Sequence, residues 1–127
     1  MAAAFQIREQ LRAHLERYSD VQSRPEFGNV VYYVGGAQFA ALTDGAALMH
    51  LPPTELTEAL RSGVAKPFVS AGAMGRNGWV EMGLSAASFE DLSRFIDAAH
   101  RAAQHAHRRS RRKQPGRAPR RRPTRST

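Results

Sequence analysis

Cysteine is absent from this chain of 127 residues. Its absence excludes disulfide bonds, thiolate metal sites and cysteine nucleophiles. A chain without cysteine suits a reducing compartment, so the composition predicts a cytoplasmic protein.

Long apolar runs are absent as well. A helix that spans a bilayer needs about 20 successive apolar residues, and every apolar stretch of this sequence is far shorter than that. Near the N-terminus, Arg8 and Glu9 break up the segment that would have to serve as the apolar part of a secretory signal. We therefore expect neither an integral membrane protein nor a secretory signal.

Acidic residues are missing from the last twenty positions, 108–127, which hold ten of the nineteen Lys and Arg residues. Residues 1–107 carry nine bases and eleven acids, so their formal net charge is −2, whereas that of the whole chain is +8. A stretch of 107 residues is the usual size of one domain. The sequence thus predicts a mildly acidic domain, 1–107, followed by a basic segment, 108–127.

Three segments have the apolar spacing of amphipathic helices. The first covers residues 4–18, and the second covers residues 53–62, with Pro53 in its first turn and Gly63 as a left-handed C-cap. The third opens at Ser88, which stands three residues before Asp91 in a variant of the capping box. Its expected core face consists of Leu92, Phe95, Ile96, Ala99 and Ala103.

Short runs rich in β-branched and aromatic residues predict five strands. The first three, 29–34, 37–42 and 46–51, are separated by Gly35-Gly36 and Asp44-Gly45, which favour type I′ or II′ turns. Two more strands, 68–71 and 79–84, flank a glycine-rich loop at 72–78.

These elements predict an α+β fold of two layers in the order α-β3-α-β2-α. Three helices cover one face of an antiparallel-rich, five-stranded sheet. We expect the basic segment 108–127 to be disordered, because its prolines and Gly116 oppose a helix and its charges oppose a core.

Several short motifs occur within residues 20–103: Arg24-Pro25-Glu26-Phe27-Gly28, Tyr33, Gly36, Phe39 to Leu42, Leu48, Leu51-Pro52-Pro53, Gly63 to Phe68, and Arg76-Asn77-Gly78-Trp79-Val80. Through these motifs the chain resembles the TfoX N-terminal domain. It is also similar to the MmcQ/YjbR family and to a small bacterial domain labelled luciferase-like.

The resemblance implies the same α-β3-α-β2-α fold. DNA binding is associated with the MmcQ/YjbR name, and competence regulation with full-length TfoX. Neither association brings site residues to this sequence.

The basic segment predicts non-specific binding of DNA or RNA through phosphate contacts. It contains no aromatic residue, so base stacking within the segment is excluded and sequence preference should be slight. The alternative for this segment is a solubilising extension. The predicted contact residues are Arg108, Arg109, Arg111, Arg112, Lys113, Arg117, Arg120, Arg121, Arg122 and Arg125.

A ligand pocket on the domain is a second prediction. Trp79 begins a strand close to Arg76, and Tyr33 lies on a neighbouring part of the expected sheet. A Trp in such a place lines a pocket or stacks on a base, or it closes the edge of a core. The glycine-rich loop fits neither G-x-G-x-x-G nor a Walker A motif, so the sequence assigns no phosphate cradle there.

Catalytic and metal-binding signatures are lacking. The serines stand outside a G-x-S-x-G elbow, and His100, His105 and His107 lack the i, i+4 spacing of a helical zinc site. The sequence therefore predicts no catalytic residue, no metal and no cofactor, and oligomeric state is left open.

Two interpretations of function follow. The first is a non-enzymatic binding or regulatory domain with a basic segment for polyanions. The alternative is a small enzyme or enzyme-accessory domain of unassigned chemistry, as the luciferase-like label suggests. Adsorption of the basic segment to anionic lipid needs only the same charge.

Overall fold

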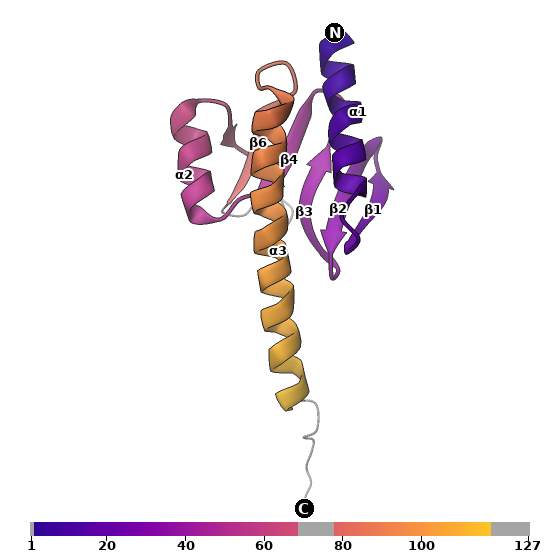
Figure 1. Ribbon diagram of the computed structural model, residues 1–127, viewed down its shortest axis with the longest axis vertical. Helices are drawn as coiled ribbons and strands as arrows, with labels where there is room; N and C mark the ends of the chain where they lie inside the picture. Colours follow the sequence, from indigo (N-terminus) through magenta and orange to yellow (C-terminus); the bar gives the residue numbers. More distant parts are fainter. Residues whose placement is uncertain (1, 69–77, 118–127) are drawn as a thin grey trace, which may run out of the picture.

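The computed structural model describes residues 2–68 and 78–117, and Figure 1 shows how their elements are arranged. Side chains are described from residue 4 to residue 110 of these segments. The elements are α1 (Ala2–Glu16), β1 (Val21–Glu26), β2 (Asn29–Val34), β3 (Ala37–Leu42), β4 (Ala46–His50), α2 (Pro53–Ser62), β5 (Lys66–Pro67), β6 (Trp79–Gly83) and α3 (Phe89–Arg117).

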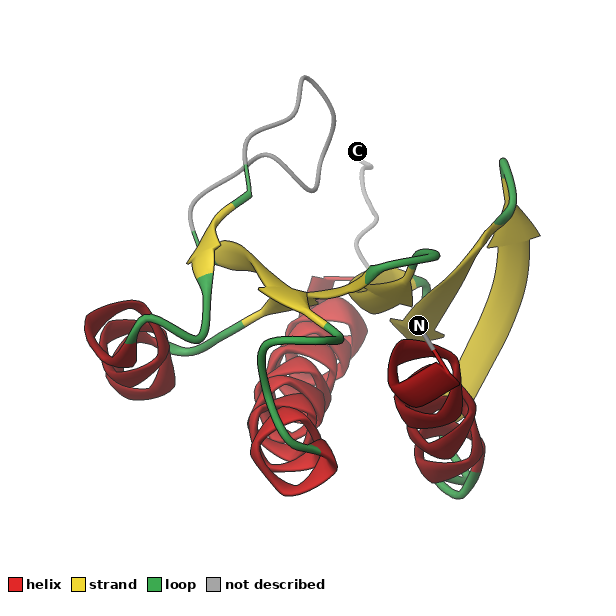
Figure 2. Ribbon diagram, turned by 90° about the horizontal axis from the view of Figure 1, so that it is seen from above, coloured by secondary structure: helices red, strands yellow, loops and turns green. Residues whose placement is uncertain are grey.

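The described residues form an α+β fold of two layers, as the sequence predicts. One antiparallel sheet has the strand order β1-β2-β3-β4-β6-β5, and α1, α2 and α3 all lie against the same face of it (Figure 2). The prediction of five strands is wrong, because the described part of the sheet has six.

The additional strand is β1, which contains Arg24 and Pro25. Local sequence patterns do not predict this strand, because proline normally interrupts regular structure. β1 is an edge strand, paired only with β2 among the described strands, and Pro25 stands opposite Val30. A proline is tolerated there because an edge strand leaves part of its N–H groups without a partner strand.

The last predicted strand pair also differs. β5 consists of Lys66 and Pro67, ahead of the predicted strand at 68–71. Phe68 still donates its backbone N–H to the carbonyl oxygen of Trp79, 3.0 Å away. Residues 69–71 of that predicted strand, and 72–77 of the predicted loop, lie outside the described residues.

The hairpin turns confirm one of the two turn predictions. Gly35 and Gly36 have φ of 60° and 87°, the left-handed values of a type I′ turn. Gly45 has no positive φ, so the same prediction for Asp44-Gly45 is wrong. Thr43 closes that turn instead, since its Oγ1 accepts the N–H of Ala46 at 3.1 Å and its own N–H bonds to the Ala46 carbonyl oxygen.

The core lies between the sheet and the helices. Leu11 and Leu15 of α1 belong to one buried cluster with alternate residues of β2, β4 and β6, including Tyr32, Met49 and Met82. β3 departs from strict alternation, because a bulge opposite Tyr32 and Tyr33 turns both Phe39 and Ala40 toward the helices.

The opposite face of the sheet holds a smaller apolar cluster. It consists of Val31, Ala41, Leu48 and Trp79, with Tyr33 and Phe68 packed against it. Alternation of side chains along the strands places these residues away from the helices. Trp79 is therefore part of a packed surface on the outer face, and only 6% of it is exposed.

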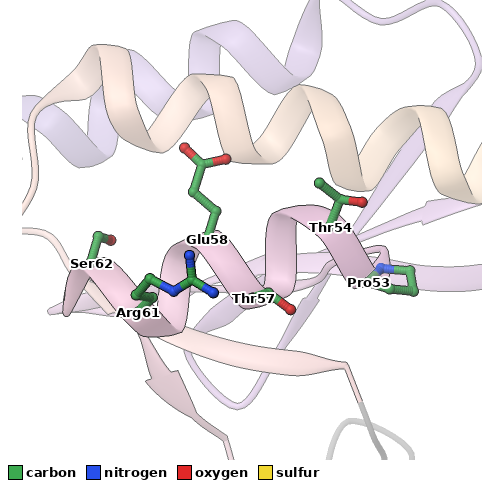
Figure 3. Close-up of a pocket in the computed structure, with 6 residues that line it drawn as sticks. All are labelled: Pro53, Thr54, Thr57, Glu58, Arg61 and Ser62. Atoms are coloured by element: carbon green, nitrogen blue, oxygen red, sulfur yellow. The ribbon is translucent and has the colours of Figure 1, made fainter.

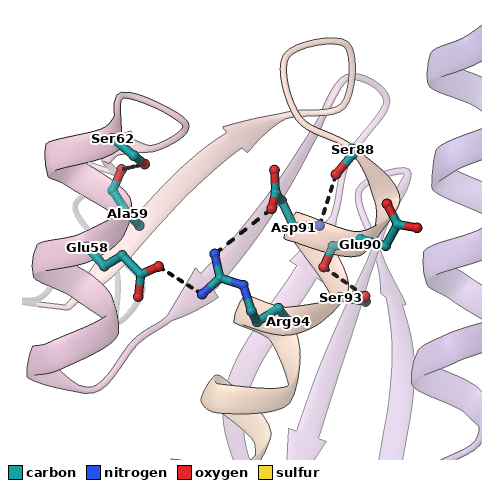
Figure 4. A network of polar contacts seen from close by, with 8 residues as sticks. All are labelled: Glu58, Ala59, Ser62, Ser88, Glu90, Asp91, Ser93 and Arg94. Atoms are coloured by element: carbon teal, nitrogen blue, oxygen red, sulfur yellow. Dashed lines mark hydrogen bonds and ion pairs between the residues drawn. The ribbon is translucent and has the colours of Figure 1, made fainter.

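The helix ends follow the predicted capping chemistry (Figure 4). α2 ends at Gly63, whose φ of 83° is left-handed, and Ser88 Oγ accepts the backbone N–H of Asp91 at 3.1 Å. Arg94 of α3 donates to Glu58 of α2 at 2.9 Å and so joins the two helices. The ion pair is half exposed, so its net contribution to stability is at most about 1 kcal/mol.

α3 extends further along the chain than the sequence predicts. The sequence predicts that no helix continues beyond His107, whereas the backbone is helical up to Arg117. Arg, Lys, Gln and Ala favour helix, and extending a helix that is already nucleated by core packing costs little. Pro115 and Gly116 occur only where the helix ends, and the disorder predicted for 118–127 lies outside the described residues.

The packing of His107 against the β2–β3 turn can be tested by substitution. A Cβ added to Gly35 would lie 2.2 Å from Nδ1 of His107, whereas one added to Gly36 meets nothing within 4 Å. Both glycines have positive φ, so either change to Ala costs about 1–2 kcal/mol. We expect Gly35→Ala to lower the urea midpoint further than Gly36→Ala, and His107→Ala to remove that difference. Equal destabilisation in the two single variants would contradict the contact.

A second stability prediction concerns Tyr32, which is 1% exposed. Its hydroxyl has no hydrogen-bond partner within the described part of the chain. A buried polar group without a partner costs about 1–3 kcal/mol. Tyr32→Phe should therefore raise the free energy of unfolding measured in urea, and Tyr33→Phe, which removes a hydrogen bond to Glu26, is the matched control and should lower it. A loss of stability in Tyr32→Phe would show that the hydroxyl has a partner.

Candidate functional site

α3 is divided into a buried half and a projecting half. Its first turns pack Leu92, Phe95 and Ile96 into the core, each at most 1% exposed. Its C-terminal half runs well past the end of the sheet (Figure 1). From Ala98 to Arg117 this helix carries seven Lys and Arg residues and no acid, so the projecting half is strongly cationic.

A groove of about 690 Å³ lies where α3 leaves the sheet. One wall is the flank of α3 from Ala99 to Ser110, which presents four alanines. The other wall is formed by the β2–β3 turn, the segment from His50 to Pro53, and Trp79. The volume is within the range of about 300–1,000 Å³ that is usual for small-ligand sites.

Aromatic and basic side chains line this groove, and none of the residues that line it is Asp or Glu. His50, His105 and His107 contribute imidazole rings, and Arg109 contributes a permanent positive charge. Gln38 and Ser110 add neutral hydrogen-bonding groups. The groove thus favours an anion that also has a flat, apolar surface.

Close packing on glycine holds two of these rings. His107 lies against Gly35, where only the absence of a Cβ leaves room for the imidazole. His50 lies against Gly78 in the same way, and its ring centroid is 5.7 Å from that of Trp79 at a tilt of 53°. The rings are therefore fixed by tertiary packing.

A second hollow, of about 630 Å³, lies on α2 (Figure 3). Its six lining residues all belong to that one helix, so no second element of the described chain encloses it. Figure 3 shows Glu58 pointing toward α3, in keeping with its ion pair to Arg94. This hollow lacks aromatic residues, and the groove beside α3 is the better candidate for a binding site.

A network of polar side chains joins α1 to α3 on the other flank of α3. Nε2 of His14 lies 2.8 Å from Oδ1 of Asp97, and the Tyr18 hydroxyl donates to the same carboxylate oxygen. The ring of Tyr18 stacks on His100, with centroids 3.8 Å apart. His100 is only 7% exposed, and its Nε2 lies 2.8 Å from Oδ1 of Asp20.

The electrostatics of this network support ionised carboxylates. Burial opposes ionisation of Asp97, but hydrogen bonds from Tyr18 and His14 outweigh it and lower the pKa. Burial likewise opposes ionisation of Asp20, and hydrogen bonds from His100 and Gln104 lower its pKa. Burial, and then the bond to Asp97, raise the pKa of Tyr18. The network is thus neutral at Tyr18 and anionic at both aspartates near pH 7.

These pKa directions predict how stability changes with pH. A carboxyl group with a lowered folded-state pKa stabilises the fold above its unfolded value, about 3.9, and that stability is lost as the pH falls through the folded value. Asp97→Asn should lower the free energy of unfolding by about 1 kcal/mol at pH 7, a figure kept small because the side chain is partly exposed.

The difference between Asp97→Asn and the unchanged protein should shrink as the pH falls below about 4. Urea unfolding at pH 7 and pH 3 measures it, and Asp44→Asn in the exposed β3–β4 turn is the matched control. A difference that stays the same at both pH values would contradict ionised Asp97 as the stabilising group.

The structure brings two residues of the predicted ligand pocket to the apolar cluster on the outer face, where Tyr33 packs against the group that contains Trp79. Tyr33 donates to Glu26 at 2.7 Å, and the guanidinium of Arg24 lies 5.1 Å from its ring centroid. Arg76 lies outside the described residues. Among the described residues of the predicted pocket, Trp79 also lines the groove and Tyr33 does not.

The predicted cations fall into two groups. Residues 108–117 form the last turns of α3, beyond the sheet. These turns contain six of the predicted contact residues: Arg108, Arg109, Arg111, Arg112, Lys113 and Arg117. Arg120, Arg121, Arg122 and Arg125 lie outside the described residues. Arg109 is shared between this helix and the groove.

Sequence reasoning missed the groove and the polar network. The network pairs α1 with residues about eighty positions away, and the one local signal was the i, i+4 spacing of His14 and Tyr18. His50 was not singled out, because a lone histidine at a strand end carries no motif. The histidine spacing in α3 was considered only for metals, although His105 and His107 both line the groove.

The described residues hold neither a cluster of metal-ligating side chains nor a helix suited to span a membrane. No three His, Asp or Glu side chains among them come together as metal ligands would. None of their helices has the length and apolar character needed to cross a bilayer.

No family model matches this chain, and no curated protein or solved structure matches it either. The similarity of residues 20–103 to TfoX and MmcQ/YjbR therefore stays a prediction. What is known of the site comes from the contacts and charges described above.

Proposed function

We propose that this chain is a non-enzymatic binding module that holds nucleic acid, without sequence specificity, along the projecting half of α3. The observation that carries the proposal is the segregation of charge. Residues 1–107 are mildly acidic, whereas the helix that leaves them has no acid after Asp97. An acidic body next to a cationic helix orients a polyanion toward the helix.

The dimensions of the projecting helix suit a phosphate backbone. At about 1.5 Å per residue, the ten residues from 108 to 117 extend about 15 Å. Duplex DNA carries about one charge per 1.7 Å, hence on the order of nine phosphates over that length. The six cations in this stretch provide a comparable density of positive charge.

The polar network does not favour the enzyme alternative. His14, Tyr18 and Asp97 form a compact cluster, but none of them lines either hollow described above. Their hydrogen bonds join α1 to α3, which accounts for the cluster as a structural link. The resemblance to TfoX and MmcQ/YjbR, groups associated with DNA and its uptake, supports the binding proposal.

Replacing cations on the projecting helix tests the proposal. The full chain with Arg108, Arg109, Arg111 and Arg112 changed to Gln keeps helix-forming residues and has four fewer positive charges. For each phosphate that the variant no longer neutralises, the slope of log K against log salt should become flatter by about 0.9. We expect weaker binding of a DNA duplex, measured by fluorescence anisotropy from about 50 to 300 mM salt, the range over which counterion release acts strongly.

The matched control removes four cations elsewhere: Arg12, Arg17, Arg61 and Lys66, all exposed. This control lowers the net charge by the same amount but leaves the cations of the projecting helix in place. We therefore expect it to keep the salt slope of the unchanged protein. If both variants bind equally weakly, net charge and not the helix governs binding. If vesicles of anionic lipid bind more tightly than DNA at the same salt, a membrane surface replaces nucleic acid as the partner.

A further inference from the structure

We infer that the groove beside α3 binds an unpaired nucleobase, so that the protein prefers single strands to duplex; this inference rests on the proposed function. The basic segment contains no aromatic residue and on its own offers only charge. The fold supplies the missing aromatic surface next to it.

Position is the first argument. The flank of α3 from Ala102 to Ser110 forms one wall of the groove, and the cationic stretch begins at Arg108 on the same helix. Arg109 follows Ala102 by seven positions, or about 10 Å of helix. A strand whose phosphates lie along the projecting turns therefore passes the mouth of the groove.

Surface chemistry is the second argument. Bases bind unspecifically by stacking on aromatic rings, because every base has a flat face. Three aromatic residues line the groove: His50 and Trp79 at the end of the sheet, and His107 on α3 beside small alanines that leave room for a planar group. Its edges carry Gln38 and Ser110, which can hydrogen-bond to the edge of a base.

Charge is the third argument. A nucleotide brings its phosphate with it, and an acid in the groove would repel that phosphate. The lining has no Asp or Glu, and Arg109 stands at the phosphate side, where the cationic helix begins. The base of a nucleotide is thus matched by the aromatic rings of the groove, and its phosphate by Arg109.

The groove also discriminates between strand types. A base in a duplex must leave its pair and its stack before it can enter a pocket, which costs several kcal/mol. An unpaired base avoids most of this cost. Preference for single strands then follows from the groove, while affinity for phosphates follows from the helix.

Three probes of about 12 nucleotides, within the usual site size of a single-strand binding domain, separate these contributions. They are oligothymidylate, an abasic strand with the same number of phosphates, and a duplex of the same length. The full chain should bind oligothymidylate at least about fivefold more tightly than the abasic strand. Trp79 is the single tryptophan of the chain, and its emission should change with oligothymidylate and not with the abasic strand.

A variant that fills the groove provides the decisive comparison. Ala102 and Ala106 both line it, and changing them to Leu adds bulk with little change in helix propensity. Ala102→Leu/Ala106→Leu should abolish the preference for oligothymidylate and leave the abasic affinity unchanged. Ala13→Leu, at an exposed position of α1, is the control and should keep the preference.

Two results would overturn the inference and leave the proposed function intact. One is equal affinity of the unchanged protein for oligothymidylate and the abasic strand. The other is a preference that survives in the groove-filled variant. Failure of all three probes to bind at low salt would instead overturn the proposed function, and the inference with it.

Discussion

The structure depends on the packing of the first half of α3 across the sheet. Leu92, Phe95 and Ile96 are buried against strands and against α1, and each such side chain stabilises the fold by about 1.5–3 kcal/mol. This apolar contact fixes where the helix axis lies. Because the helix continues beyond the sheet, the same contact also fixes the direction of its cationic half.

Hydrophobic packing alone would leave the rotation of α1 against α3 loosely determined. The polar network supplies direction, because a hydrogen bond requires particular atoms at particular distances. His14 and Tyr18 meet Asp97, and Asp20, which follows α1, meets His100 and Gln104. The opposite flank of α3 remains lined by alanines and forms a wall of the groove.

Local patterning predicted most of the fold. Helical spacing located α1 and α2 closely, Gly63 was identified as a left-handed cap, and Gly35-Gly36 was identified as a turn with positive φ. These features are encoded by neighbouring residues. β1 was missed because its position at the sheet edge, which makes Pro25 acceptable, is a property of the assembled sheet. The predicted end of α3 was wrong for a related reason. Core contacts about twenty residues before Pro115 and Gly116 anchor the helix, and it extends until it reaches these two residues.

Charge and shape are encoded at different levels of this protein. The cationic stretch is visible in the sequence, since charge needs no folding to exist. The groove exists only after α3 has docked, because Gly35 and His107 are far apart in sequence, as are Gly78 and His50, and only the folded chain places each ring on its glycine. A binding site that uses both the cationic stretch and the groove distinguishes a strand with bases from an abasic strand only in the folded state. Unfolding would remove this selectivity for bases and leave the affinity of the cationic stretch for phosphates.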